Sequence, residues 1–202
     1  MRVMRMNSIV RVALPFALAG ALAGCGSSSS NKSSSSGSSS SSGALAADAK
    51  SAATGDIPDN QNFLTFKGAA FSIKYPEGWS QKKSAGGIDF QDKNNLVRIQ
   101  VRNGPAPTAA SVTAELNKLK ATSPTLKAQT PKQISLKAGP AIKVTYTTTS
   151  APNPVTGKRV VLMVDRYELA KKGRVAVIDL GTPTGVDNVD AYRMMSESFT
   201  WL

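Results

Sequence analysis

The stretch Phe71-Ser72-Ile73-Lys74-Tyr75-Pro76-Glu77-Gly78-Trp79 decides how the folded part of this chain is interpreted. Apolar and polar side chains alternate from Phe71 to Tyr75, which is the pattern of a strand with one buried face. Pro76 and Gly78 then occupy the second and fourth positions of a turn. The stretch therefore predicts a strand and a tight turn near the start of a β-rich domain.

The segments that follow and precede this stretch repeat the strand pattern. We expect strands at residues 62–66, 87–91, 96–102, 132–136, 142–147, 160–169 and 174–180. The turn residues between the second and third of these predict a hairpin. Val160 to Val164 is apolar without alternation, which predicts a central strand that is covered on both faces. Ser80 and the residues up to Gly87 are expected to form a loop.

Two segments show helical spacing. Ser111 is expected to cap the first helix, which ends at Pro124, and Asp187 is expected to cap the second, with Asp190 in its first turn. Their apolar positions are Val112, Leu116 and Leu119 in the first helix and Val189, Tyr192, Met195 and Phe199 in the second. Two groups of strands, one helix between them and one after them predict an α+β domain. Short connections predict a mainly antiparallel sheet.

Two motifs resemble the PsbP-like family, whose fold is shared by plant PsbP, a eukaryotic Ran-binding nuclear import factor and many bacterial lipoproteins. The first is the stretch 71–79, and the second is Met194-Met195-Ser196-Glu197-Ser198-Phe199-Thr200-Trp201, which is similar to the closing helix and tail of that fold. The resemblance covers about residues 62–202. It implies an antiparallel sheet with helices on both faces, an α/β/α sandwich, and it brings no catalytic residues.

Residues 1–24 have the features of a lipoprotein signal peptide. Early arginines precede an apolar run from Val12 to Ala23, which is shorter than the about 20 residues that a membrane span needs. The junction Leu22-Ala23-Gly24-Cys25 resembles the bacterial lipobox, which implies cleavage between Gly24 and Cys25 and long acyl chains such as palmitate on Cys25. Several acyl chains on one residue anchor a protein firmly. The plainer alternative is an ordinary signal peptide followed by an incidental cysteine.

A serine-rich segment follows the expected anchor. Residues 26–43 contain 13 serines and 3 glycines in 18 positions, so they cannot bury enough apolar surface to offset the entropy of ordering. We expect residues 25–61 to be a disordered, lipid-anchored tether that holds a domain, residues 62–202, at the outward face of the cell membrane. The alternative is an insertion without a function of its own.

The composition excludes several kinds of site. The 202 residues include no His and one Cys, whereas zinc sites use Cys or His and a serine or cysteine triad needs an imidazole. Ser80 and Lys83 have a Ser-x-x-Lys spacing, but the partner motifs of that enzyme class are missing. Two aspartate pairs lack the close ligand spacing of a calcium loop; these are Asp56 with Asp59 and Asp187 with Asp190. We predict no catalytic residue, no metal and no cofactor.

The charge balance favours an anionic partner. The chain has 25 basic and 13 acidic residues, and cleavage of a signal with three arginines leaves a formal charge of +9. An anionic membrane or wall polymer would attract such a protein, whereas nucleic acid is not expected outside the cell. The candidate contacts are Lys158, Arg159, Lys171, Lys172 and Arg174. They fall at opposite ends of one expected strand, so the plain interpretation is solvated charge. Arg98 and Arg102 share one strand face, and a shallow anionic site there is the sharper interpretation.

The aromatic residues favour a core. A stacking platform for a sugar or lipid is the alternative, but Phe71, Tyr75, Trp79, Phe199 and Trp201 all occupy positions that can face inward. We expect Trp79 and Phe199 to share one core. The sequence therefore predicts a non-catalytic binding or accessory module of the cell envelope, with an envelope protein or a wall polymer as its partner. The alternatives are a carrier of a lipid or small hydrophobic ligand between sheet and helix, and an enzyme; the sequence does not predict the oligomeric state.

Overall fold

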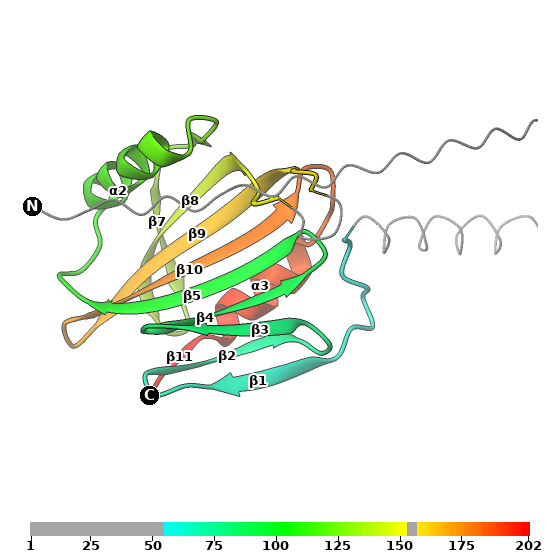
Figure 1. Cartoon of the computed structure of the whole chain (residues 1–202). Helices are drawn as coiled ribbons and strands as arrows, with labels where there is room; N and C mark the ends of the chain where they lie inside the picture. Colours follow the sequence, from blue (N-terminus) through cyan, green and yellow to red (C-terminus); the bar gives the residue numbers. More distant parts are fainter. Residues whose placement is uncertain (1–54, 153–156) are drawn as a thin grey trace, which may run out of the picture. The chain divides into compact units, whose positions relative to one another are not determined.

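The computed structural model describes residues 55–152 and 157–202, which form two antiparallel sheets and two helices (Figure 1). The small sheet has the order β1-β2-β11, with bounds Phe63–Lys67, Phe71–Pro76 and Thr200–Trp201. The large sheet has eight strands in the order β3-β4-β5-β10-β9-β8-β6, and β7 also pairs with β8. Its strands are β3 (Ser80–Ser84), β4 (Gly87–Asp92), β5 (Asn95–Asn103), β6 (Lys127–Ala128), β7 (Lys132–Leu136), β8 (Gly139–Thr149), β9 (Val161–Lys171) and β10 (Arg174–Pro183). The prediction of a mainly antiparallel sheet is confirmed.

Two of the strand predictions are wrong in detail. Residues 80–84 form strand β3, which pairs with β4, although we expected a loop. All five of its side chains are exposed, so no apolar alternation marks it in the sequence. The start of β9 is not covered on both faces, because Val161 and Met163 are 53% and 40% exposed. This part of β9 buries alternate side chains, as a strand with one exposed face does.

The first helix, α2 (Ala109–Thr122), begins three residues earlier than expected. Its N-cap is Thr108, whose hydroxyl accepts a hydrogen bond from the Ser111 N–H, while the Ser111 hydroxyl accepts one from the Thr108 N–H. This reciprocal arrangement is a capping box. Ser111 therefore supports the cap from the third helical position instead of forming it.

The second helix, α3 (Val189–Ser198), has Asn188 at its N-cap, one residue later than expected. The carboxylate of Asp187 still accepts a hydrogen bond from the Val189 N–H, at 3.2 Å. Val189 is 66% exposed and does not belong to the buried face, whereas Tyr192 and Met195 do. In the described part of the chain, neither helix has the length and apolar character that crossing a membrane requires.

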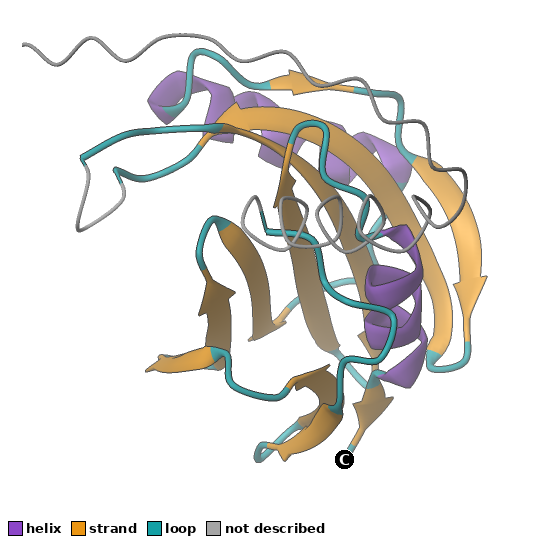
Figure 2. Ribbon diagram, turned by 90° about the vertical axis from the view of Figure 1, so that its right-hand side faces the viewer, coloured by secondary structure: helices purple, strands orange, loops and turns teal. Residues whose placement is uncertain are grey.

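The larger apolar cluster joins α3, the small sheet and one side of the large sheet. Trp79 and Phe199 both belong to it, so the prediction that they share one core is confirmed. The ring of Phe199 stacks on Phe71 at 5.6 Å between centroids and meets Trp201 edge-on at 5.3 Å. Figure 2 shows that the large sheet is curved and that α3 lies within the curve.

A second apolar cluster lies under α2. Val112 and Leu116 of the helix pack with side chains of β8 and β9, among them Val144 and Val164. The larger cluster takes Ala141 from β8 and other side chains from β9. Because successive side chains of a strand point to opposite faces, the two clusters lie on opposite sides of β8 and β9.

The folded part begins earlier than predicted, because residues 55–61 belong to it. Ile57 is only 8% exposed and packs in the larger cluster. Its N–H donates to Oδ1 of Asn188 at 2.8 Å, and Nδ2 of Asn188 donates to the Gly55 carbonyl at 3.2 Å. The same Nδ2 also lies within hydrogen-bond distance of Oδ1 of Asn95 and Oγ1 of Thr182. We call this group the Asn188 hub.

The expected anchor Cys25, the cleavage point at Gly24 and the serine run lie outside the described residues.

Candidate functional site on the sheet face

A row of alternating charges crosses one face of the large sheet. Lys82 of β3 stands opposite Asp89 of β4, which stands opposite Arg98 of β5. Arg98 in turn stands opposite Asp179 of β10, and Asp179 stands opposite Arg166 of β9. Directly opposite residues of an antiparallel pair point to the same face with Cβ atoms about 5 Å apart. The pairing therefore lines up five charged side chains whose signs alternate.

The inner end of this row is a buried ion pair. Arg166 donates from Nε and Nη2 to the two carboxylate oxygens of Asp179, at 2.7 and 2.9 Å, and both side chains are 9% exposed. The guanidinium also lies over the ring of Tyr146, 5.7 Å from its centre. Burial alone would lower the pKa of Arg166, but the hydrogen bonds and the charge of Asp179 outweigh it and raise that pKa. The guanidinium of Arg166 therefore stays charged beside Asp179.

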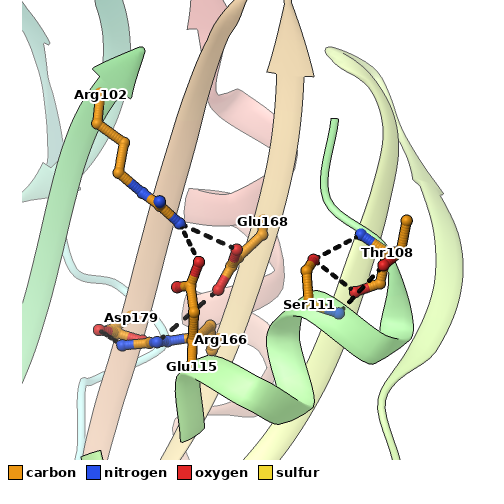
Figure 3. Close-up of polar contacts among 7 residues, drawn as sticks. All are labelled: Arg102, Thr108, Ser111, Glu115, Arg166, Glu168 and Asp179. Atoms are coloured by element: carbon orange, nitrogen blue, oxygen red, sulfur yellow. Dashed lines mark hydrogen bonds and ion pairs between the residues drawn. The ribbon is translucent and has the colours of Figure 1, made fainter. Parts of the chain in front are cut away.

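A third carboxylate, Glu168, lies beside this pair and under α2 (Figure 3). It is 1% exposed, and its two oxygens lie 3.8 Å from Nη1 of Arg166 and 3.8 Å from Nη2 of Arg102. Glu115 of α2 forms the closer ion pair with Arg102. Oε1 of Glu168 has no hydrogen-bond partner. Burial, and then the negative charge of Glu115, raise the pKa of Glu168 to about 7.

This geometry makes Glu168 a structural acid and not a reacting one. A pKa near 7 suits a general acid or base, but a catalytic group must come within hydrogen-bond reach of its substrate. The side chain is almost completely covered, so nothing in solution reaches it while α2 is in place. A side chain that binds a ligand is therefore expected at the other, exposed end of the row.

The outer end of the row opens into a hollow of about 270 Å³. Three cationic side chains line it: Lys82 from β3, Lys93 from the turn between β4 and β5, and Arg98 from β5. Among the described residues of the lining, Asp89 is the one acid. Side chains of β4 and of the loop after β8 complete the wall, with Gln91 among them. Three cations and one acid leave the lining with a formal charge of +2.

Asp89 holds Arg98 in position and leaves part of its guanidinium available. Nε and Nη2 of Arg98 donate to Oδ1 and Oδ2 of Asp89 at 3.0 and 2.8 Å. The hydrogen bonds to Asp89, which outweigh burial, raise the pKa of Arg98, so it is always charged. A guanidinium has five N–H donors. The carboxylate uses the Nε–Nη2 edge of it, and no contact among the described residues uses the N–H groups of the Nη1–Nη2 edge.

The basic residues that the sequence singled out lie in two separate places. Arg159 donates from Nη1 to the carbonyl of Ser150 at 2.9 Å, and Ser150 lines the hollow. At the other end of β9, Arg174 donates to the carbonyl of Leu202 at 3.0 Å and lies over the ring of Trp201. Lys158 lies just before β9, whereas Lys171 ends that strand and Lys172 follows in the turn to β10. The five residues do not form one surface.

Lys82 was missed because the residues from Ser80 up to Gly87 were expected to form a loop. Lys93 was missed because it lies in an expected hairpin turn, and a turn residue by itself does not show which strand faces it. In the structure, β3 carries Lys82 on the face of the charge row, and the β4–β5 turn brings Lys93 to the same hollow. Lys93 has a φ of 51°, which is uncommon for a residue other than glycine, asparagine or aspartate. The alternation of residues 96–102 did indicate that Arg98 faces away from the apolar side of its strand.

Ser80 and Lys83 do not form a nucleophilic pair. Their positions in β3 differ by three, so their side chains point to opposite faces of the strand. The Ser80 hydroxyl donates to the carbonyl of Gln91 at 2.8 Å. The two side chains therefore lie apart, on opposite faces of the edge strand β3.

The two aspartate pairs are far apart in the sequence but lie close together in the structure. Asp56, Asp59, Asp187 and Asp190 line one hollow of about 300 Å³ beside the start of α3. Within residues 55–152 and 157–202, however, no group of three or more acidic, histidine or cysteine side chains is close enough to hold a metal ion. The meeting of the pairs therefore does not make a cation site.

Comparison with known proteins identifies the fold. No protein-family model matches the sequence, and no curated protein sequence matches it. The solution structure of cyanobacterial PsbP (CyanoP) from Synechocystis sp. PCC 6803 matches 73% of this chain and 98% of its own, with a TM-score of 0.54 and 14% identity. A crystal structure from Bacteroides thetaiotaomicron matches 70% of this chain and 48% of its own, with a TM-score of 0.44 and 14% identity. The first likeness supports a PsbP-like fold.

Proposed function

We propose that this chain is an exported, lipid-anchored accessory protein whose PsbP-like domain binds an anionic group of the cell envelope and catalyses no reaction. The observation that carries the proposal is the hollow formed by Lys82, Lys93 and Arg98. Its lining has a formal charge of +2 and lies at the open end of a charge row whose other end is buried. An anion bound there would continue the alternation of charges.

The membrane anchor rests on the sequence. Leu22-Ala23-Gly24-Cys25 supports lipid attachment at Cys25, and the serine-rich tether would let the domain reach partners beyond the membrane surface. The formal charge of +9 on the mature chain would concentrate the domain near anionic lipid or wall polymer. Among the anionic molecules that the overall charge attracts, the hollow would bind only those that fit it.

We further propose that α2 and α3 cover opposite faces of the large sheet, as in an α/β/α sandwich. The alternation of side chains in β8 and β9 between the two apolar clusters supports this arrangement. Its consequence for function is that the hollow, which side chains of β3, β4 and β5 line, lies on the same face of the sheet as α2.

The two hollows described above suit a polar ligand better than a lipid, although a third, of about 340 Å³ beside the start of α2, has mainly apolar walls. They contain about 270 and 300 Å³ and are lined by charged side chains. Apolar carriers use pockets with mainly apolar walls. The apolar interior of this domain is instead occupied by its own aromatic and aliphatic side chains, such as Phe90 and Met195.

The test compares two variants that lose the same charge. In one, Lys82 and Lys93 are changed to Gln; in the other, Lys171 and Lys172 are changed to Gln. The full chain, purified in detergent, is mixed with isolated cell-wall polymer, and the bound fraction is measured by sedimentation as salt rises. We expect the first variant to bind several-fold more weakly than the second. Equal losses would show that only the overall charge matters and would contradict a site in the hollow.

A further inference from the structure

We propose that the hollow is a site for a phosphate monoester carried on a small polyol. This inference rests on the proposed function, because it names the chemical class of the anion that the same hollow takes. Three properties of the hollow support it: its charge, the donors of Arg98 and its size.

The charge of the lining matches a doubly charged anion. Lys82, Lys93 and Arg98 against Asp89 leave a formal charge of +2. A phosphate monoester carries about −1.5 to −2 near pH 7, whereas a single carboxylate carries −1. The monoester therefore matches the formal charge of the lining, whereas a single carboxylate balances only half of it.

The donors of Arg98 suit the oxygens of a phosphoryl group. Asp89 occupies the Nε–Nη2 edge of the guanidinium with two hydrogen bonds and so fixes its plane. The Nη1–Nη2 edge then presents parallel N–H donors that can reach two oxygens of one phosphate at the same time. Because the side chain is already held, little rotamer entropy is lost when the ligand binds.

The size of the hollow limits what the phosphate is attached to. About 270 Å³ is just below the range of about 300–1,000 Å³ that is usual for small-molecule sites. A phosphoryl group with a polyol of a few carbons therefore suits it better than a larger ligand. The side-chain amides of Gln91 and Asn94 lie in the lining and can bond to polyol hydroxyls or phosphate oxygens.

Strand β3 offers a matched pair of variants. Lys82 stands opposite Asp89 on the face of the charge row, whereas Lys83 stands opposite Ile88 on the other face. Both lysines are exposed and adjacent, so K82Q and K83Q remove the same charge from the same strand. Titration calorimetry of the full chain in detergent then measures the binding of glycerol 3-phosphate. We expect about tenfold weaker binding for K82Q and a change of less than twofold for K83Q.

The outcomes separate the two proposals. If K82Q and K83Q lose the same affinity, neither the phosphate site nor the hollow as the binding site survives. If succinate binds as tightly as glycerol 3-phosphate and depends equally on Lys82, the hollow binds anions but the preference for phosphate is wrong. Thermal unfolding of both variants, expected to match the unmodified chain, shows that any loss of binding is not a loss of folding.

A lipid and a soluble polyol can both present this group, and vesicles distinguish them. The vesicle experiment uses the Cys25→Ala chain, which has no acyl anchor of its own, with or without K82Q. Vesicles of phosphatidylcholine that contain phosphatidic acid carry a phosphate monoester on a lipid. If glycerol 3-phosphate displaces the chain from these vesicles and K82Q releases it, the phosphate comes from a lipid headgroup. If K82Q weakens only the binding of soluble glycerol 3-phosphate, the natural ligand is soluble or polymeric. If neither probe gives saturable binding that depends on Lys82, the inference is wrong.

Discussion

The carboxylates of Glu115 and Glu168 meet at a single nitrogen of Arg102, Nη2, one of them from α2 above and the other from β9 below. The guanidinium of Arg102 therefore interacts with two carboxylates, one from the helix and one from the sheet. Glu115 is the nearer partner, and Glu168 remains at 3.8 Å with one oxygen that has no hydrogen-bond partner. Arg102, Arg166, Glu115 and Asp179 are the charged groups that act on it.

The first prediction concerns the pH dependence of stability. The pKa of Glu168 is raised to about 7 from its ordinary value of 4.5, so the fold binds its proton more tightly than the unfolded chain does. The resulting stability is present below about pH 4.5 and is lost as the pH rises to about 7, by roughly 3 kcal/mol in total. We expect Glu168→Gln to flatten this loss in urea unfolding measured from pH 4 to 8. Glu197→Gln, at an exposed site, is the control, and an equal slope in both variants would contradict the prediction.

The second prediction concerns the buried ion pair. Asp179→Asn leaves the guanidinium of Arg166 buried without its counter-charge, which should cost about 3–5 kcal/mol of unfolding free energy. Asp190→Asn removes an acid from the exposed pair with Arg193 and should cost less than about 1 kcal/mol. Denaturant unfolding of the two variants under the same conditions compares them. Similar losses would mean that Asp179 and Arg166 are solvated in the native protein.

The third prediction concerns the aromatic core. Phe199 is 1% exposed, and Trp79 is 8% exposed in the same cluster. Truncation of either residue to Ala should destabilise the fold by roughly 3–5 kcal/mol, because it removes a large buried side chain and leaves a cavity. Chemical denaturation measures the loss. A variant that keeps its stability but no longer binds its ligand would instead place the aromatic residue at a surface site.

The fourth prediction concerns where a shortened chain can begin. A chain that starts at residue 50 keeps Gly55 and Ile57 and should unfold like the mature protein. A chain that starts at residue 60 loses the burial of Ile57 and the hydrogen bond from its N–H to Asn188, which should cost about 2–3 kcal/mol. Thermal unfolding of the two chains gives the comparison. Identical midpoints would show that residues 55–59 do not stabilise the domain.

The fifth prediction concerns the anchor. Replacement of Cys25 by Ala removes the thiol that the lipobox presents, so the chain should move from the membrane fraction to the soluble fraction. Cell fractionation followed by detection of the protein tests this. Ser27→Ala, two residues further along, should leave the protein in the membrane. A Cys25→Ala chain that stays as firmly bound as the unmodified one would exclude lipid attachment as the anchor.

Sequence patterns predicted the apolar parts of this fold better than its polar parts. The alternation in Phe71–Tyr75 and in residues 96–102 marks strands because each has one buried face. Strand β3 has no buried side chain and is held mainly by its pairing with β4, and no local pattern reveals that pairing. For the same reason, the sequence did not indicate that Lys82 belongs to the candidate site.

The pairing of strands that are distant in sequence also determines which charged residues lie next to one another. Arg98 and Asp179 are 81 positions apart in the numbering, and only the pairing of β5 with β10 shows that they stand side by side. Asp187 and Asp190 were interpreted from their helix alone, and their approach to Asp56 and Asp59 depends on the fold. Ile57 was missed for a related reason, because one apolar residue between Gly55 and Pro58 gives no periodicity.

The Asn188 hub determines where tension on the N-terminal side of the domain would act. A pull on the chain before Gly55 reaches the fold at residues 55–57, ahead of the edge strand β1. There the load passes through Asn188 to Asn95 at the start of β5 and to Thr182 near the end of β10, two neighbouring strands of the large sheet. These contacts would have to yield before β1 could be peeled from β2. The first contacts to carry such a load would therefore be the hydrogen bonds of this cluster and not those between a pair of strands.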